Sequence, residues 1–166
     1  MMARKLLLTV AALMTLSLIA FAAAKPNFSG SWTMDRGRSY GLPGDMNQTL
    51  TITQKDDQIE VETKLIQPNN ERTVKDTYTL DGQEHDFTPS VPPNAPPTKG
   101  KRTVVWLPGD RGIQITDVTT VESPKGPERS QVVRKWTMSA QGELVIDMYV
   151  DTPNVSYEAK RIFIKK

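Results

Sequence analysis

The sequence predicts an all-β protein: one antiparallel β-barrel that follows an N-terminal export signal. Three observations predict it. Most of the chain consists of short runs in which apolar and polar residues alternate, no long segment after the N-terminus has helical periodicity, and the turns between the runs are short. Alternation with a period of two is typical of half-buried strands. Closure into an up-and-down barrel of about eight or nine strands removes unpaired edges, so we favour it over a sandwich.

The N-terminal segment has the pattern of a secretory signal peptide. Arg4 and Lys5 precede an uncharged, largely apolar run from Leu6 to Ala24 that ends in three alanines. A basic start, an apolar centre and a small-residue end are the three parts of such a signal. We expect cleavage before Lys25, which removes 24 of the 166 residues and leaves 142 in the periplasm or outside the cell. An uncleaved membrane anchor is the alternative, since the run is long enough to span a bilayer.

The expected strands follow one another along the remaining chain, residues 25–166. The clearest pair places Leu50 and Ile52 on one face, a polar turn at 55–58, and Ile59 and Val61 on the next strand, which is a hairpin pattern. The expected strands are residues 29–34, 49–53, 59–62 with Leu65 in phase, 72–80, 101–107, 112–121, 129–138, 143–150 and 156–165.

Two segments interrupt the strands. Residues 35–47 are rich in glycine, and residues 83–100 contain five of the twelve prolines. Proline cannot donate a hydrogen bond to a β-ladder, so we expect a proline-rich loop at 83–100. A solvated connection is the simpler interpretation, and a flap over the mouth of the barrel is the other.

Composition limits the classes of partner. Two of the 21 basic residues lie in the signal, which has no acidic residue, so the domain has 19 basic and 19 acidic residues. Nucleic acids and anionic lipids favour an excess of basic residues, and we expect neither as a partner. No cysteine is present, so disulfides and thiolate chemistry are excluded. An exported domain without cysteine favours a bacterial periplasm or secretion, with no membrane span after cleavage.

No pattern in the chain indicates catalysis, a metal or a cofactor. His85 is the single histidine, and one histidine without cysteine does not build a typical zinc site. No serine lies in a G-x-S-x-G motif. We therefore expect a protein that is not an enzyme, although two carboxylates that meet within a barrel would be compatible with one.

The first and last strands carry a resemblance. Residues 27–32 read N-F-S-G-S-W, and this G-x-W on the first strand resembles the opening motif of lipocalins and the wider calycin superfamily. The resemblance implies that a basic residue of the last strand, here Arg161, covers Trp32 and closes the base of the barrel. An indole face attracts a guanidinium group, which can also donate to nearby carbonyls.

The chain also resembles a group of bacterial exported lipocalin-like proteins of unassigned activity. The shared features are F-S-G-S-W with Asp35 and Ser39 after it, L-D-G-Q-E at 80–84, Trp106 before Gly109-Asp110, and W-T-M-S at 136–139 with Gly142 and Leu144. The proline-rich insertion after Glu84 departs from this pattern.

The predicted function is binding of a small apolar or amphiphilic ligand. Aromatic and methionine side chains suit such ligands, and the candidates to line a pocket are Tyr78, Trp106, Trp136 and Met148. Alternatively these side chains fill the core, because a small barrel has little spare room. The protein would then be a structural or protein-interaction module of the cell envelope. The sequence leaves the oligomeric state open.

Overall fold

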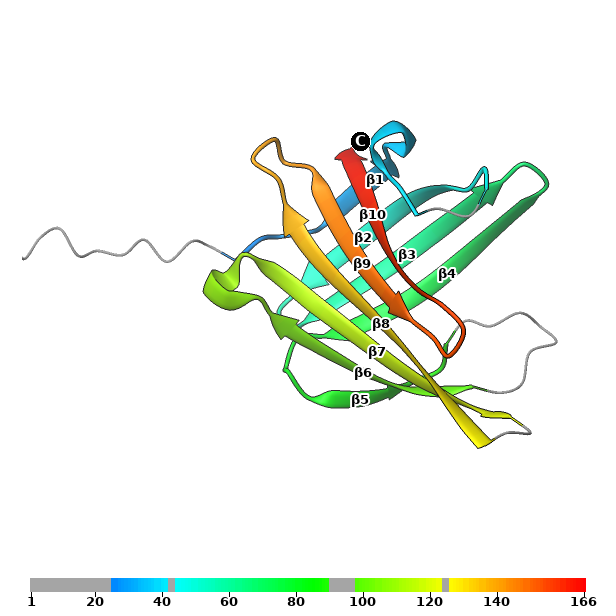
Figure 1. Cartoon of the computed structure of the whole chain (residues 1–166). Helices are drawn as coiled ribbons and strands as arrows, with labels where there is room; N and C mark the ends of the chain where they lie inside the picture. Colours follow the sequence, from blue (N-terminus) through cyan, green and yellow to red (C-terminus); the bar gives the residue numbers. More distant parts are fainter. Residues whose placement is uncertain (1–24, 42–43, 90–97, 124–125) are drawn as a thin grey trace, which may run out of the picture.

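The structure, a computed structural model, describes residues 25–41, 44–89, 98–123 and 126–166. The predicted signal peptide therefore lies outside the described residues. Figure 1 shows strands that curl around a common interior. The ten strands are β1 (Gly30–Met34), β2 (Asn47–Lys55), β3 (Gln58–Gln67), β4 (Asn70–Thr79), β5 (Glu84–Phe87), β6 (Lys99–Trp106), β7 (Gly112–Ser123), β8 (Gly126–Met138), β9 (Leu144–Asp151) and β10 (Ser156–Lys165).

The strands form one antiparallel sheet in the order β4-β3-β2-β1-β10-β9-β8-β7-β6-β5. Every neighbour in this order is a chain neighbour except β1 and β10, which bring the two ends of the domain together. The predicted antiparallel up-and-down topology is confirmed, with ten strands in place of eight or nine. The two strands at the ends of the order, β4 and β5, are consecutive in the chain and diverge from the turn that joins them (Figure 1).

Part of the expected proline-rich loop is a strand. β5 occupies Glu84–Phe87 and β6 already begins at Lys99, both within residues 83–100. The sequence conceals β5 because three of its four side chains are polar and exposed, so no alternation marks it. Its backbone pairing with β6, from Glu84 opposite Thr103 to Phe87 opposite Gly100, holds it in place. Prolines 92, 93, 96 and 97 lie outside the described residues.

The interior changes character along the barrel. At one end lies the apolar core, made of inward side chains from almost every strand. We call it the apolar half: Phe28, Trp32, Met34, Leu50, Ile52, Ile59, Val61, Tyr78, Leu80, Val104, Ile113, Ile115, Trp136, Leu144, Ile146 and Phe163.

Two residues further along five of these strands, the inward positions carry charge. Because side chains two apart on a strand share a face, these charges also lie toward the interior. We call this set the ionic layer: Asp76, Arg102, Asp117, Arg134 and Arg161.

Trp32 closes the apolar half at its base. The residue is 1% exposed, and its indole Nε1 donates to the carbonyl of Phe28 at 2.9 Å. The cation over its ring is Lys165, with Nζ 5.5 Å from the centroid. Lys165 lies directly opposite Trp32 in the β1–β10 register. Arg161 lies four residues away on β10, or ~13 Å at the usual rise per residue. The position over Trp32 that the resemblance implies for Arg161 thus belongs to Lys165.

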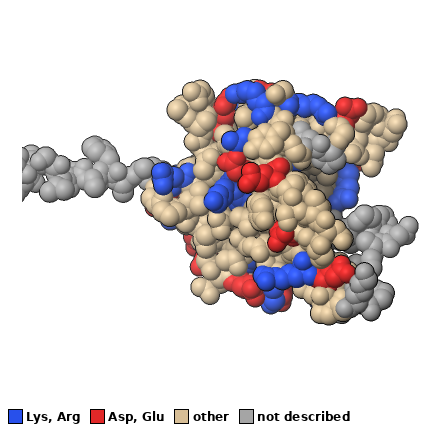
Figure 2. Space-filling model, in the orientation of Figure 1, with Lys and Arg blue, Asp and Glu red and all other residues tan. Residues whose placement is uncertain are grey.

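The outer surface carries charges of both signs. Figure 2 shows basic and acidic side chains interspersed over the visible face. Within the part of the chain that the structure describes, no helix has the length and apolar character needed to cross a membrane.

Candidate functional site

A cavity of about 190 Å³ lies at the boundary between the apolar half and the ionic layer. Its walls come from β2, β3, β4, β8, β9 and β10, so it lies within the curl of the sheet. Most of the lining residues are apolar, and the charged ones are Asp76, Arg134 and Arg161 of the ionic layer. The lining residues are Gln48, Leu50, Val61, Thr63, Leu65, Val74, Asp76, Tyr78, Arg134, Trp136, Ile146, Met148, Arg161 and Phe163.

A network of ion pairs centres on Asp117 of β7. Asp117 lies opposite Arg102 of β6 in the strand register. It accepts hydrogen bonds from Arg102 Nε at 2.6 Å and from Arg102 Nη2 at 2.9 Å. It also accepts one from Arg134 Nη2 of β8. Arg102 Nη1 donates to Asp76 Oδ1 of β4 at 3.0 Å, so the network joins β4, at one end of the strand order, to β6, next to the other end.

The guanidinium group of Arg102 lies between two aromatic rings. Its Cζ is 4.6 Å from the ring centroid of Tyr78 and 4.2 Å from that of Phe87. Burial works against the charged form, but the hydrogen bonds that Arg102 donates to Asp117 and Asp76, and its attraction to Tyr78 and Asp117, outweigh it and raise the pKa of Arg102. Burial also raises the pKa of Tyr78. Arg102 therefore stays charged, and the Tyr78 phenol stays neutral, across the physiological range.

Arg161 is bound differently. Its Nη1 donates to the carbonyl of Tyr40 at 2.9 Å, and its Nη2 lies 3.4 Å from the carbonyl of Gly41. No ion pair between described residues includes Arg161. Burial lowers the pKa of Arg161, because it disfavours the charged guanidinium group. An anion placed beside Arg161 would be stabilised by it.

The connection between β1 and β2 lies tightly on β10. Tyr40 and Lys160 exchange two backbone hydrogen bonds of 3.0 and 3.1 Å. A Cβ atom on Gly41, which has φ +68°, would lie 2.7 Å from Cβ of Ala159, so only glycine permits this approach. This contact brings the carbonyls of Tyr40 and Gly41 to Arg161.

Three hydrogen-bond donors of cavity residues have no partner among the described residues. They are the Nε atoms of Arg134 and Arg161 and the indole Nε1 of Trp136, all buried. Buried donors are almost always satisfied in folded proteins, because leaving one without a partner costs about 1–3 kcal/mol. All three belong to side chains that line the cavity, so the polar part of its wall carries donors without acceptors.

The structure brings together three of the four predicted lining residues. Tyr78, Trp136 and Met148 line the cavity, and Tyr78 and Trp136 meet edge to face, with centroids 5.7 Å apart. Trp106 does not line it. It packs against the edge of the core, and Lys25 Nζ lies 4.6 Å from its ring centroid.

Apart from Arg161, which was expected over Trp32, the charged residues of the site were missed in the sequence, although a signal for them exists. Each lies two positions from a buried apolar residue of the same strand. Arg102 precedes Val104 by two residues, and Asp117 follows Ile115 by two. A charge in phase with the apolar face of a strand is placed in the interior, where it needs a partner. The same pattern holds for Asp76 with Tyr78, Arg134 with Trp136 and Arg161 with Phe163.

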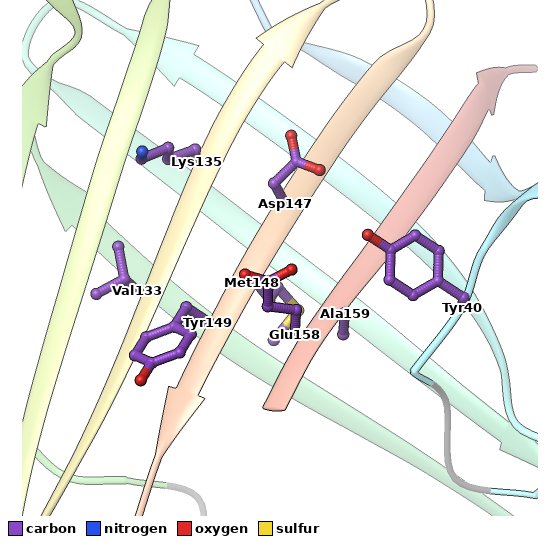
Figure 3. Close-up of a pocket in the computed structure, with 8 residues that line it drawn as sticks. All are labelled: Tyr40, Val133, Lys135, Asp147, Met148, Tyr149, Glu158 and Ala159. Atoms are coloured by element: carbon purple, nitrogen blue, oxygen red, sulfur yellow. The ribbon is translucent and has the colours of Figure 1, made fainter. Parts of the chain in front are cut away.

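A second concavity, of about 330 Å³, lies on the outer face of β8, β9 and β10. In Figure 3, Tyr40 and Tyr149 stand on opposite sides of Glu158. Both tyrosines are among the exposed large apolar residues. Lys135 and Asp147 complete the polar part of the rim (Figure 3). This surface is separate from the interior cavity, apart from Met148, which borders both.

His85 is engaged in a surface contact. Its Nε2 lies 2.9 Å from Oδ2 of Asp81. The residues that the structure describes contain no group of three or more histidine, cysteine, aspartate or glutamate side chains able to hold a metal ion.

No protein-family model matches the chain, and no curated protein matches it in sequence. Solved structures with a similar course of strands include secretory abundant heat soluble protein 4 from Ramazzottius varieornatus (15% identity, TM-score 0.49, 83% of this chain and 94% of that one). Two others are a fatty-acid-binding protein from Manduca sexta (14%, TM-score 0.44) and one from brain tissue of Drosophila melanogaster (14%, TM-score 0.47). Each of these two matches 84% of this chain and 100% of its own. The similarity is limited to the general arrangement of strands.

Proposed function

We propose that this protein is an exported, non-enzymatic binding protein for a small amphiphile with an apolar chain and one negatively charged group. The observation that carries the proposal is the interior cavity, whose largely apolar lining includes three residues with an unsatisfied buried donor, Arg134, Trp136 and Arg161. Ligand pockets in proteins commonly combine an apolar lining with a few placed polar groups.

The net charge of the ionic layer supports a ligand with a negative charge. Three guanidinium groups face two carboxylates there, which leaves one positive charge in the interior. Arg161 has no carboxylate partner among the described residues, and its Nε is free. A carboxylate or a sulfonate would supply both the missing charge and the missing acceptor.

Binding of octanoate tests the proposal, with octanol and octylamine as ligands of similar shape and different charge. We expect calorimetry to show octanoate binding at least about tenfold more tightly than octanol, with no binding of octylamine. Equal binding of all three would contradict the charged part of the proposal. Binding of none would contradict the ligand class.

A matched pair of variants on β10 locates the site. Arg161→Met removes one of the two cations that line the cavity, and Lys160→Met removes the adjacent cation on β10, whose Nζ pairs with Asp147. We expect Arg161→Met to weaken octanoate binding by about tenfold or more and Lys160→Met to leave it unchanged. A similar loss in both would show that the effect is not local to the cavity.

Export is the second part of the proposal, and the N-terminal charge and apolar pattern supports it. Expression of the full chain in a bacterium, followed by fractionation and N-terminal sequencing, tests it. We expect the periplasmic protein to begin at Lys25. Retention of residues 1–24 in a membrane fraction would favour an anchored protein.

The outer concavity favours a second candidate, an interaction module of the cell envelope. The exposed rings of Tyr40 and Tyr149 and the carboxylate of Glu158 present mixed polar and apolar chemistry to solvent. Crosslinking in cells with a photoreactive residue at position 149 tests this candidate. Recovery of the uncrosslinked monomer alone would argue against it.

A further inference from the structure

The curled sheet has one boundary without backbone pairing. β4 and β5 end the strand order, and no ladder between described residues joins β4 to β5 or β6. We call this boundary the seam. At its base it is closed by the turn between the strands, where Gly82 N donates to the carbonyl of Val104 at 3.1 Å. From that turn β4 and β5 diverge (Figure 1).

Side chains close the seam where it passes the cavity. Arg102 of β6 reaches Asp76 of β4 with a 3.0 Å hydrogen bond and lies against the ring of Tyr78, also of β4. Asp76 and Tyr78 are themselves part of the cavity wall. Separation of these two contacts would therefore open the cavity sideways.

The contacts of Arg102 are divided between the two sides of the seam. On its own side it keeps two hydrogen bonds to Asp117 and the ring of Phe87. Across the seam it has one hydrogen bond to Asp76 and the ring of Tyr78. If β4 moves away, Arg102 keeps its counterion.

Asp76 can also lose this contact at small cost. Its side chain is 29% exposed, against 9% for Asp117, so water can replace the guanidinium group. An uncompensated buried charge would oppose opening, and this arrangement avoids one.

We propose that the ligand enters and leaves through the seam, and that the contacts of Arg102 with Asp76 and Tyr78 control its opening. The passage of a ligand through the seam rests on the proposed binding function, but the opening of the seam does not. The opening itself can be measured without a ligand.

Asp76→Asn is the variant that tests the seam. It keeps the shape of the side chain and removes the charge that bonds Arg102 across the seam. Glu62→Gln is the matched control, because the Glu62–Lys75 pair (3.1 Å) also involves β4 but joins it to β3, where a backbone ladder already exists. Circular dichroism checks that both variants fold.

Quenching of Trp136 fluorescence by acrylamide measures opening without ligand. Trp136 lies edge-on to Tyr78, so loss of the Tyr78 contact exposes it. A Trp106→Phe background removes the half-buried indole, and the other remaining indole, Trp32, is 1% exposed. We expect Asp76→Asn to raise the quenching constant by up to about tenfold, because loss of one charge-assisted hydrogen bond shifts the opening equilibrium by about that factor. Glu62→Gln should leave the quenching constant unchanged. Equal quenching in the two variants would overturn the proposal.

Stopped-flow binding of octanoate then tests the route. We expect Asp76→Asn to raise the association and dissociation rates together, by about tenfold, relative to Glu62→Gln. Unchanged rates with increased quenching would show that the seam opens but is not the route. If octanoate binds neither protein while quenching still increases, the proposed function fails and the opening of the seam stands.

The parent protein supplies a measurement that does not depend on a stable variant. Amide relaxation dispersion should show microsecond-to-millisecond exchange on β4 and none on β9 and β10. Flat profiles on β4 would overturn the proposal as well.

Discussion

The apolar half and the ionic layer have the same backbone architecture and opposite side-chain chemistry. In the apolar half, inward positions hold residues such as Trp136 and Ile115, which gain free energy by leaving water. Two residues along the same strands, Arg134 and Asp117 are also turned inward. Taking such charges out of water costs several kcal/mol each, and their mutual attraction offsets this only in good geometry.

This difference in side-chain chemistry indicates that the apolar half and the ionic layer have different roles. An apolar replacement of similar volume often stabilises a protein as well as a buried ion pair does, so stability alone does not explain the ionic layer. The apolar half stabilises the fold, and the ionic layer borders the cavity and the seam. The following changes test this division, from the largest expected effect to the smallest.

Trp32→Ala should show the largest loss, because it removes the largest fully buried side chain of the apolar half. We expect the free energy of unfolding to fall by about 3–5 kcal/mol, as measured by urea denaturation. Trp106→Ala is the control at a half-buried position and should cost clearly less. Equal losses at both positions would contradict the placement of Trp32 at the base of the core.

Asp117→Asn should destabilise the protein by about 2–3 kcal/mol, because Asp117 accepts charged hydrogen bonds from both Arg102 and Arg134. Urea denaturation measures the loss. The informative comparison is the triple variant Arg102→Met, Asp117→Leu, Arg134→Met, which replaces the charges by apolar groups.

For that triple variant we expect a stability within about 1 kcal/mol of the parent together with loss of octanoate binding. Such a result would separate the function of the ionic layer from the stability of the fold. A triple variant that is less stable than Asp117→Asn alone would show that the ion pairs hold the barrel together.

Gly100→Ala tests one side of the seam. A Cβ atom at Gly100 would lie 2.5 Å from Cε1 of Phe87 and 3.0 Å from the carbonyl of Val118, so the Phe87 ring, which lies against Arg102, must shift. We expect a loss of about 1–2 kcal/mol by urea denaturation and increased acrylamide quenching. Gly37→Ala, whose Cβ would meet only Oδ1 of Asp35 at 3.5 Å, should be nearly neutral. A neutral Gly100→Ala would mean that Phe87 has free space around it.

The sequence predicted the strands in which apolar and polar residues alternate regularly. It did not predict the strand in which they do not. The strand pattern that produces the apolar half, for example Leu50 and Ile52 against Ile59 and Val61, is visible in the chain and is borne out. β5 is not visible, because its exposed Glu84-His85-Asp86 has no apolar phase and depends on pairing with β6.

The site was harder to predict than the fold, because it depends on register. Which cation covers Trp32 is decided by the pairing of β1 with β10, which places Lys165 opposite the indole. The pairing of Arg102 with Asp117 likewise needs the β6–β7 register, and their contact with Asp76 needs the curl that brings β4 to β6. A single sequence shows which residues of a strand share a face, but it does not show which residues of neighbouring strands pair with one another.

The smallest expected effect concerns an ion-pair cluster outside the interior, and it sharpens the contrast with the ionic layer. Arg38 Nη2 reaches Glu143 Oε1 at 2.7 Å, and its Nε reaches Asp35 Oδ2 at 2.6 Å, with all three groups partly exposed to water. Hydrogen bonds from Arg38 lower the pKa of Glu143 and the pKa of Asp35. A carboxyl group with a lowered pKa in the folded state stabilises the protein above its unfolded pKa, and this contribution disappears as the pH falls through the folded value.

Arg38→Ala should therefore lower the melting temperature slightly at neutral pH, and the difference should shrink as the pH falls through the folded pKa values of Glu143 and Asp35. Added sodium chloride should reduce the difference at neutral pH, because exposed pairs are screened. The Asp117→Asn loss should persist in the same salt, since buried pairs are screened much less. Equal salt sensitivity of the two losses would mean that water reaches the ionic layer as freely as it reaches the surface, and the division of the interior proposed above would not hold.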